Sequence, residues 1–228
     1  MPLPVIAIFD AYGTLFDVHS AVRRVTGSVG AEDAGRISAL WRDKQLEYSW
    51  TRSLMGTYAD FWQVTEEALD YALTTCKVDD TKLRDALLVA YRTLESYPDV
   101  HTTLAGYHDL GIRTAVFSNA TPDMLHAALV SASLDEIVDM TFSTDTLRRY
   151  KPDPEVYAQA CKAFGAEPET IVFHSSNAWD AAGAASFGWR TFWVNRAHGA
   201  PEYAWAGLNE CPSLDAALAR VHATRQNP

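Results

Sequence analysis

Residues 5–14 read VIAIFDAYGT, an apolar run that ends in an aspartate. The run at 5–9 is typical of a parallel strand that is buried on both faces. Asp10 would then lie at the carboxyl end of that strand, where open α/β sheets place their chemistry. The stretch therefore predicts an α/β fold with a carboxylate at its functional edge.

The composition of the 228-residue chain fits one α/β domain with a modest insertion. Its formal net charge of −10 argues against nucleic acid or an anionic membrane as a partner. The three cysteines are widely spaced and odd in number, which favours a reduced, cytoplasmic setting. The N-terminus has no basic segment before its apolar run, and no stretch is long enough to span a membrane. We therefore expect a cytoplasmic protein.

The segment between the first strand and Pro98 has a helical pattern. Apolar side chains recur at helical spacing in three stretches, 37–48, 61–73 and 83–94. No convincing strand is predicted in this segment. We expect it to form a helical cap that is inserted after the first strand.

Strands and helices alternate again after Pro98. Further strands are expected at residues 114–117, 140–143, 170–174 and 191–194. This alternation produces a parallel sheet that is wrapped by helices. The sequence thus predicts a Rossmann-like parallel-sheet core of residues 1–15 and 98–228, and a helical cap of residues 16–97 that hangs over the strand ends.

Four segments at predicted strand ends carry polar side chains: residues 10–14, 118–119, Lys151 and 175–180. Each segment alone has an ordinary structural explanation, such as a turn, a helix cap or a solvated lysine. Their order and their shared position at strand ends favour one common site.

These segments resemble the motifs of the haloacid dehalogenase superfamily. They read DAYGTLFD at 10–17, SN at 118–119, KPD at 151–153 and SSNAWD at 175–180. In addition, LWRDKQLEY at 40–48 is similar to the arginine-bearing helix of the L-2-haloacid dehalogenases. The resemblance covers nearly the whole chain. It implies a homodimer that acts on small 2-haloacids and releases halide without a cofactor.

The residue at position 12 distinguishes this chain from the phosphatases that share the first motif. Those enzymes have a second aspartate there, which protonates the leaving group, and they need magnesium to hold phosphate beside carboxylates. Tyr12 can do neither. Ser175 and Ser176 stand where the phosphatases usually carry a metal-binding acid. The sequence therefore predicts a metal-free site in which Asp10 attacks carbon.

The resemblance implies that Asp10 displaces halide from C2 and forms an aspartyl ester, with inversion at C2. Lys151 would keep Asp10 ionised through its opposite charge. Water would then hydrolyse the ester to a D-2-hydroxy acid, with Asp180 as the candidate base.

Supporting roles are implied for four more residues. Ser175 and Asn177 would place Asp180 or the water, and Thr14 and Tyr157 would orient Asp10 and Lys151. Tyr157 could equally be a packing residue of a helix core. His174 stands where an apolar residue is expected, either as a hydrogen-bonded strand-end histidine or as a group that perturbs Asp180 or the water.

Anionic substrate groups beside a negative nucleophile require cations and hydrogen-bond donors. The resemblance assigns the halide to Arg42 with help from Asn119, although a lone helix arginine is commonly a solvated surface residue. For the substrate carboxylate the resemblance implies Ser118 and the backbone at Ala11 and Tyr12. For the halide it also implies the ring edges of Phe61 and Trp179. Core packing explains Phe61 equally well, and Tyr12 could simply form a wall.

Two alternatives to a dehalogenase stay open at this stage. One is a small-molecule phosphatase or phosphonatase-like hydrolase of the same superfamily, which Tyr12 and Ser175 oppose. The other is a non-catalytic binding protein on the same scaffold. A binding protein has no use for both a nucleophile and a base, so the presence of Asp10 and Asp180 opposes it.

Overall fold

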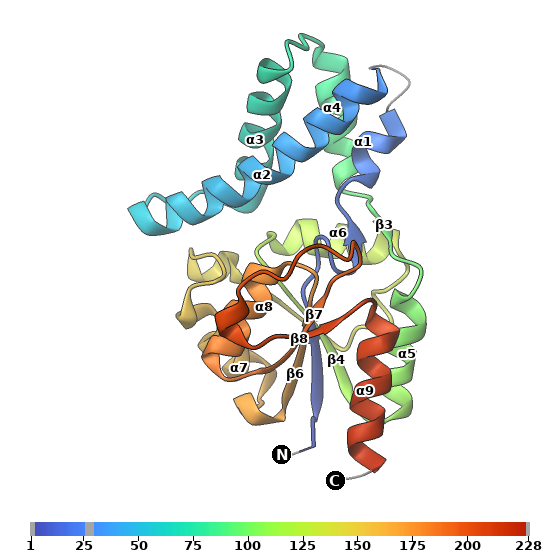
Figure 1. The fold of residues 1–228 in the computed structure, drawn as a ribbon. Helices are drawn as coiled ribbons and strands as arrows, with labels where there is room; N and C mark the ends of the chain where they lie inside the picture. Colours follow the sequence, from blue (N-terminus) through green and yellow to red (C-terminus); the bar gives the residue numbers. More distant parts are fainter. Residues whose placement is uncertain (1–2, 26–29, 227–228) are drawn as a thin grey trace.

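The computed structural model of the chain describes residues 3–25 and 30–226. Figure 1 shows a core of sheet and helices, with a separate group of helices lying above one end of the sheet. None of the described helices has the length and apolarity needed to cross a membrane.

The core is built on a six-stranded sheet with the order β5-β4-β1-β6-β7-β8, in which all neighbours pair in parallel. The strands are β1 (Ile6–Phe9), β4 (Arg113–Ser118), β5 (Met140–Ser143), β6 (Ile171–Ser175), β7 (Arg190–Val194) and β8 (Asn209–Cys211). The predicted α/β fold with a parallel sheet is confirmed. The edge strand β8 was not predicted, because its Asn-Glu-Cys sequence contains no apolar run.

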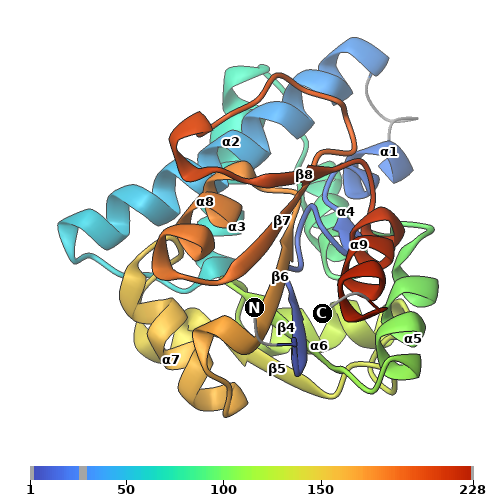
Figure 2. The same cartoon turned by 60° about the horizontal axis from the view of Figure 1, so that its bottom comes forward.

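Helices cover both faces of the sheet. The first face carries α5 (Val100–Asp109), α6 (Pro122–Ser131) and α9 (Leu214–Gln226), and the second carries α7 (Pro154–Phe164) and α8 (Ala178–Phe187). Figure 2 shows the two groups on opposite sides of the strands. Successive residues of a strand point to opposite faces, so Phe9 joins the first layer and Ile8 the second.

The segment between β1 and β4 forms the cap, whose described helices are α1 (Ser20–Val25), α2 (Ala31–Met55), α3 (Phe61–Thr75) and α4 (Thr81–Tyr91). Asp60 and Asp80 cap α3 and α4 by accepting hydrogen bonds from backbone N–H groups of the first turn. The helices α2 and α3 pack along each other, and Trp41 Nε1 donates to Thr65 O across them at 2.9 Å.

The prediction that the cap segment contains no strand is wrong. The chain enters and leaves the cap through an antiparallel pair, β2 (Phe16–Asp17) and β3 (Glu95–Ser96). Strands of two residues are too short for alternating hydrophobicity to reveal them. The pair holds the two connections side by side, which fixes where the cap leaves the core.

The cap also contacts the core at a point distant from this pair. Tyr150 N donates to Ser53 Oγ at 3.2 Å, and the Tyr150 hydroxyl donates to the carbonyl of Ala59. Tyr150 is almost fully buried by these contacts. The cap is thus attached on both sides of the strand ends, and the carboxyl end of β1 lies beneath it.

Candidate active site

Asp10 follows β1 directly, and its side chain is buried beneath the cap. Gly13 turns the chain with a φ of +93°, a value that glycine tolerates, and brings Thr14 back to the carboxylate. Asp10 Oδ2 accepts hydrogen bonds from Thr14 Oγ1 at 2.9 Å and from Asn177 Nδ2 at 2.7 Å. Oδ1 accepts one from Lys151 Nζ at 3.2 Å. These three hydrogen bonds hold the carboxylate in one orientation.

Lys151 is 1% exposed, which is unusual for a lysine. Its Nζ donates to Asp10 Oδ1 at 3.2 Å, to Asp180 Oδ2 at 2.8 Å and to Phe117 O at 2.7 Å. These acceptors use all three protons of the ammonium group. The Phe117 ring lies 4.1 Å from Nζ and adds a cation–π contact. Lys151 thus joins the two carboxylates that the sequence placed in separate motifs.

Asp180 lies in the first turn of α8 and is fully buried. Its Oδ2 accepts from Lys151, and Ser175 Oγ lies 3.5 Å from the same oxygen. Burial raises the pKa of Asp180 to about 6, and the attraction of Lys151 opposes that rise. A carboxyl with this pKa can exchange a proton near neutral pH.

Tyr157 contacts a different partner from the one that was expected. Its hydroxyl donates to Asp180 Oδ1 at 2.8 Å, so it orients Asp180 and not Lys151. The reason lies in the packing of α7 on α8: a Cβ atom at Gly183 would lie 2.5 Å from the Tyr157 hydroxyl oxygen, so glycine makes room for it. Burial, together with the charge of Asp180, raises the pKa of Tyr157 well above its usual value, which keeps it a donor.

Asn177 links the nucleophile to the cap. Its Nδ2 donates to Asp10 Oδ2 and, at 3.0 Å, to Tyr12 O. Its Oδ1 accepts from Arg42 Nη2 at 3.0 Å, and the same nitrogen donates to Tyr12 O at 3.3 Å. The expected role for Asn177 was to place Asp180 or the water, whereas these bonds connect it to Asp10 and Arg42. Arg42 points inward from α2 and is only partly exposed.

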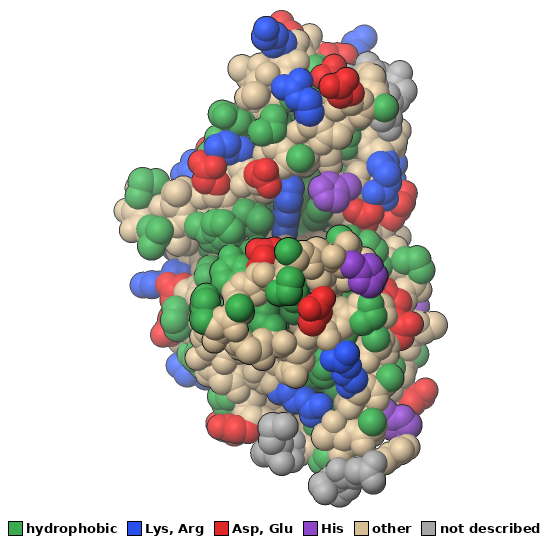
Figure 3. All heavy atoms as spheres, viewed as in Figure 1, with side chains coloured by type: hydrophobic (Ala, Val, Ile, Leu, Met, Phe, Trp, Pro, Cys, Tyr) green, Lys and Arg blue, Asp and Glu red, His purple; other side chains and the backbone are tan. Residues whose placement is uncertain are grey.

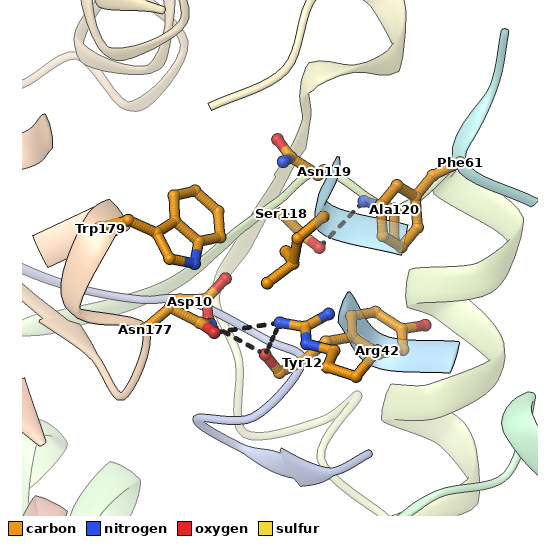
Figure 4. A pocket seen from close by; sticks show the side chains of 10 residues that line it. Asp10, Tyr12, Arg42, Phe61, Ser118, Asn119, Ala120, Asn177 and Trp179 are labelled. Carbon is orange, nitrogen blue, oxygen red and sulfur yellow. Dashed lines mark hydrogen bonds between the residues drawn. The ribbon is translucent and has the colours of Figure 1, made fainter. Parts of the chain in front are cut away.

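A small cavity of about 20 Å³ lies above Asp10, between the cap and the core. Its walls are formed by Asp10, Tyr12, Arg42, Leu46, Phe61, Ser118, Asn119, Ala120, Asn177 and Trp179. Figure 4 shows Trp179 on one side of this cavity, with Arg42 and Phe61 on the other. All the expected substrate-binding side chains line it.

Three lining positions differ from the sequence-based expectation. Leu46 and Ala120 were missed, although Leu46 follows Arg42 by four residues and so shares its helix face. Ala11 does not line the cavity; its carbonyl accepts from the backbone N–H of Leu15 at 2.8 Å and closes the turn. Phe61 lines the cavity and also packs edge-on against Tyr150, so its two explanations are compatible.

His174 is a core histidine. Its ring stacks on Phe9 and Phe192, and Nε2 lies 2.8 Å from the Tyr107 hydroxyl. Burial lowers the pKa of His174 to about 3, so the ring is neutral at ordinary pH. It belongs to the face of the sheet that α5 covers, whereas Asp180 lies on the face that α8 covers. This geometry supports the interpretation as a hydrogen-bonded strand-end histidine.

In residues 3–25 and 30–226, no group of three or more His, Cys, Asp or Glu side chains could hold a metal ion. The place between Asp10 and Asp180 is taken by the Lys151 ammonium group. Metal independence stays a prediction.

Residues 5–188 match the family described as haloacid dehalogenase-like hydrolase. The chain is 50% identical over 202 residues to (S)-2-haloacid dehalogenase 4A from Burkholderia cepacia, covering 88% of this chain and 87% of that protein. A crystal structure of a dehalogenase with an intermediate complex superposes with a TM-score of 0.93 at 46% identity, over 96% of this chain and 98% of that one. The L-2-haloacid dehalogenase from Xanthobacter autotrophicus with chloropropionic acid covalently bound superposes with a TM-score of 0.84 at 33% identity, over 96% and 99%.

Proposed function

The chain belongs to the haloacid dehalogenase-like hydrolases, and we propose that it hydrolyses short L-2-haloalkanoic acids to D-2-hydroxy acids and halide. The observation that carries the proposal is the buried carboxylate of Asp10, which faces a small cavity with Arg42 in its wall. A relative that is 50% identical over 88% of this chain is an (S)-2-haloacid dehalogenase.

In the first step, an oxygen of Asp10 attacks C2 of the substrate. The C2–oxygen bond forms while the carbon–halogen bond breaks, and the halide leaves with the bonding electrons, so no acid is needed at position 12. Oδ1 accepts one hydrogen bond and Oδ2 accepts two, which favours Oδ1 as the attacking atom. Attack from the side opposite the halide inverts C2 and leaves an aspartyl ester.

Charge in the cavity supports this step. Arg42 would stabilise the departing halide with help from Asn119, and Ser118 with the backbone at Tyr12 would bind the substrate carboxylate. Phe61 would turn a ring edge toward the halide, and Trp179 would form a wall of the cavity. Two cations, Arg42 and Lys151, balance the two carboxylates of the site before the substrate brings its own charge.

In the second step, water attacks the carboxyl carbon of the esterified Asp10. Asp180 takes one proton of the water, and the bond from that carbon to the ester oxygen breaks with its electrons on the oxygen. Protonated Asp180 then gives its proton to this oxygen, so the product leaves as a 2-hydroxy acid, and the other proton of the water passes to solvent as Asp10 regains its carboxylate. Lys151 Nζ lies within 3.2 Å of both carboxylates, so the base is close to the carbon that reacts. Tyr157 and Ser175 hold Asp180 in place.

We also propose a homodimer. Leu54 is 88% exposed and Met55 is 66% exposed at the carboxyl end of α2, where Figure 1 shows the helix projecting beyond the core. Two adjacent, exposed apolar side chains suit an interface. Light scattering should give a dimer mass, and Leu54→Glu with Met55→Glu should shift it to a monomer.

The central test measures chloride release from each enantiomer of 2-chloropropionate in ¹⁸O-labelled water. We expect turnover of the L-enantiomer alone, undiminished by EDTA, and ¹⁸O in the Asp10 peptide after several turnovers. Asp10→Asn should lower turnover by at least about 10⁴-fold, because the nucleophile is lost. Label in the product only, or retained activity in Asp10→Asn, would contradict the ester route. Magnesium-dependent phosphate release without chloride release would support the phosphatase alternative.

A further inference from the structure

Trp179 lies between two hollows of very different size. One is the cavity of about 20 Å³ above Asp10. The other is a groove of about 830 Å³ between the cap and the core, and Trp179 lines both. Figure 3 shows hydrophobic side chains gathered at this junction of cap and core. The cavity in which the reaction is proposed to occur is therefore separated from a much larger space by a wall that contains Trp179.

The groove has an apolar lining. Trp50 comes from α2, Phe187 from the end of α8, and Trp205 from the segment after β7. Apolar side chains such as these favour an alkyl chain over an ion. Transfer from water to such a surface lowers the free energy of an alkyl chain and raises that of an ion.

Trp50 supports Trp179 from the groove side. The two rings meet edge to face, with their centroids 5.3 Å apart and their planes at 79°. Trp50 stands on α2, eight residues after Arg42, so the same cap helix provides the arginine of the cavity and the support of its opposite wall. Trp50 itself lines the groove but not the cavity.

Packing alone holds these two rings in place. The Nε1 atoms of Trp50 and Trp179 are both buried, and neither has a hydrogen-bond partner among the described residues. A ring without such a bond can turn when the side chain behind it is made smaller, because turning breaks no hydrogen bond.

In-line displacement determines where the substrate's alkyl group can lie. Asp10 and the halide occupy opposite sides of C2, so the carboxylate, the hydrogen and the alkyl group lie in the plane between them. If Ser118 binds the carboxylate, the alkyl group must take another direction in that plane. Trp179 stands across the cavity from Arg42 and Phe61 and bounds one such direction (Figure 4).

We propose that Trp50 determines the length of alkyl chain that the enzyme accepts, by holding Trp179 as the wall between the cavity and the groove. This inference rests on the proposed dehalogenase function. When Trp50 is shortened, Trp179 turns aside and the chain of the substrate extends into the groove. Trp50 is a positioning residue, since it acts through Trp179 and does not touch the substrate.

The test compares the variants Trp50→Ala and Trp50→Phe with the wild type on L-2-chloropropionate, L-2-chlorobutanoate and L-2-chlorohexanoate. In Trp50→Ala, kcat/KM for chlorohexanoate relative to chloropropionate should rise at least tenfold, with a gain of roughly fourfold for each added methylene that enters the groove. Trp50→Phe removes less of the support and should give a smaller rise in the same direction. The gain should appear mainly in KM, because the chain is bound equally in the ground and transition states.

Trp62→Ala is the matched control. Trp62 is another partly buried tryptophan of the cap, but the Arg92 guanidinium covers its ring at 3.9 Å and it lines neither the cavity nor the groove. It should leave the chain-length ratio within about twofold of the wild type. Light scattering on each variant shows whether a change of assembly accompanies a change of ratio.

Three outcomes overturn the inference or its premise. Chlorohexanoate turned over by the wild type as well as chloropropionate would mean that no wall limits the chain. An unchanged ratio in both Trp50 variants, with chloropropionate still turned over, would mean that the wall does not depend on Trp50. A wild-type enzyme that releases halide from none of these acids would instead overturn the proposed function.

Discussion

Strand β6 and the following helix α8 each supply a buried ionisable group, and the two groups have different surroundings. His174 faces the layer of α5, and Asp180 lies in α8 on the other face. Burial favours the neutral form of both, lowering the pKa of His174 to about 3 and raising that of Asp180 to about 6. Only Asp180 has a buried cation, Lys151, beside it.

Burial alone therefore does not make an ionisable side chain functional. His174 is satisfied by the Tyr107 hydroxyl, by the carbonyl oxygen of Ile8 and by aromatic stacking, and the lowering of its pKa moves it away from the pH range in which it could exchange protons. Lys151 opposes the shift of Asp180, and the result lies close to neutrality. The presence of a cation between the two carboxylates therefore distinguishes the face of the sheet that carries the reactive groups from the face that carries His174.

Asp180→Asn should have the largest effect on this contrast. The amide cannot take a proton from water, so the ester should form and persist, and steady-state turnover should fall by about 10²–10⁴-fold. Mass spectrometry after mixing with L-2-chloropropionate should find Asp10 esterified. In the wild type, turnover limited by hydrolysis should fall as the pH drops through about 6, because protonated Asp180 is no longer a base. Full turnover in Asp180→Asn would remove Asp180 from the mechanism.

Lys151→Met tests whether the reactive face is held together by its cation. The change leaves two buried carboxylates without the charge between them, so the free energy of unfolding should fall by about 3–5 kcal/mol at neutral pH. Urea denaturation followed by circular dichroism measures the loss. Arg149→Met is the control, since the exposed Arg149 pairs with Asp153 at the surface, and the free energy of unfolding of this variant should stay close to that of the wild type. If both variants lose the same free energy of unfolding, the buried cation stabilises the fold no more than the surface ion pair does.

His174→Val should have the smallest effect on catalysis and a distinctive effect on stability. The folded-state pKa of His174 lies below its unfolded value, so the unfolded chain binds a proton first and wild-type stability falls as the pH drops below about 6.5. The valine variant lacks this loss. At pH 7 the variant should be less stable than the wild type, because the Tyr107 hydroxyl loses its partner. The difference in free energy of unfolding between the two proteins should shrink by about 2 kcal/mol between pH 6.5 and pH 5.

The pH dependence of turnover provides the second measurement on His174→Val. It should match that of the wild type, because the ring lies on the face away from Asp180. A shifted pH–rate profile would revive the alternative in which His174 perturbs Asp180 or the hydrolytic water.

Much of the site could be predicted because parallel strands share one edge. Asp10, Ser118 and Ser175 each follow or end an apolar run, and such runs show in the sequence without knowledge of their neighbours. The helices α3 and α4 could be predicted from apolar side chains that recur with a period of 3.6 residues. Strand β8 and the pair of β2 and β3 were not predicted, because they are too short or too polar to show a hydrophobic period.

The identity of side-chain partners could not be predicted in the same way. Tyr157 donates to Asp180, and Asn177 joins Asp10 to Arg42, through contacts between residues that are 23 and 135 or more positions apart. Such pairs depend on how closely two helices approach and on which small residue, such as Gly183, allows the approach.

The local patterns of the sequence were sufficient to predict the alternation of the longer strands and helices and the edge of the sheet at which Asp10 lies. Those properties follow from local patterns of hydrophobicity, which any stretch of chain carries in its own residues. The packing of separate elements was needed to place Lys151 between Asp10 and Asp180, to turn His174 away from them, and to bring Trp50 against the cavity wall. These contacts depend on the distances between separate elements and on how deeply the groups are buried, because burial determines how strongly charged groups interact.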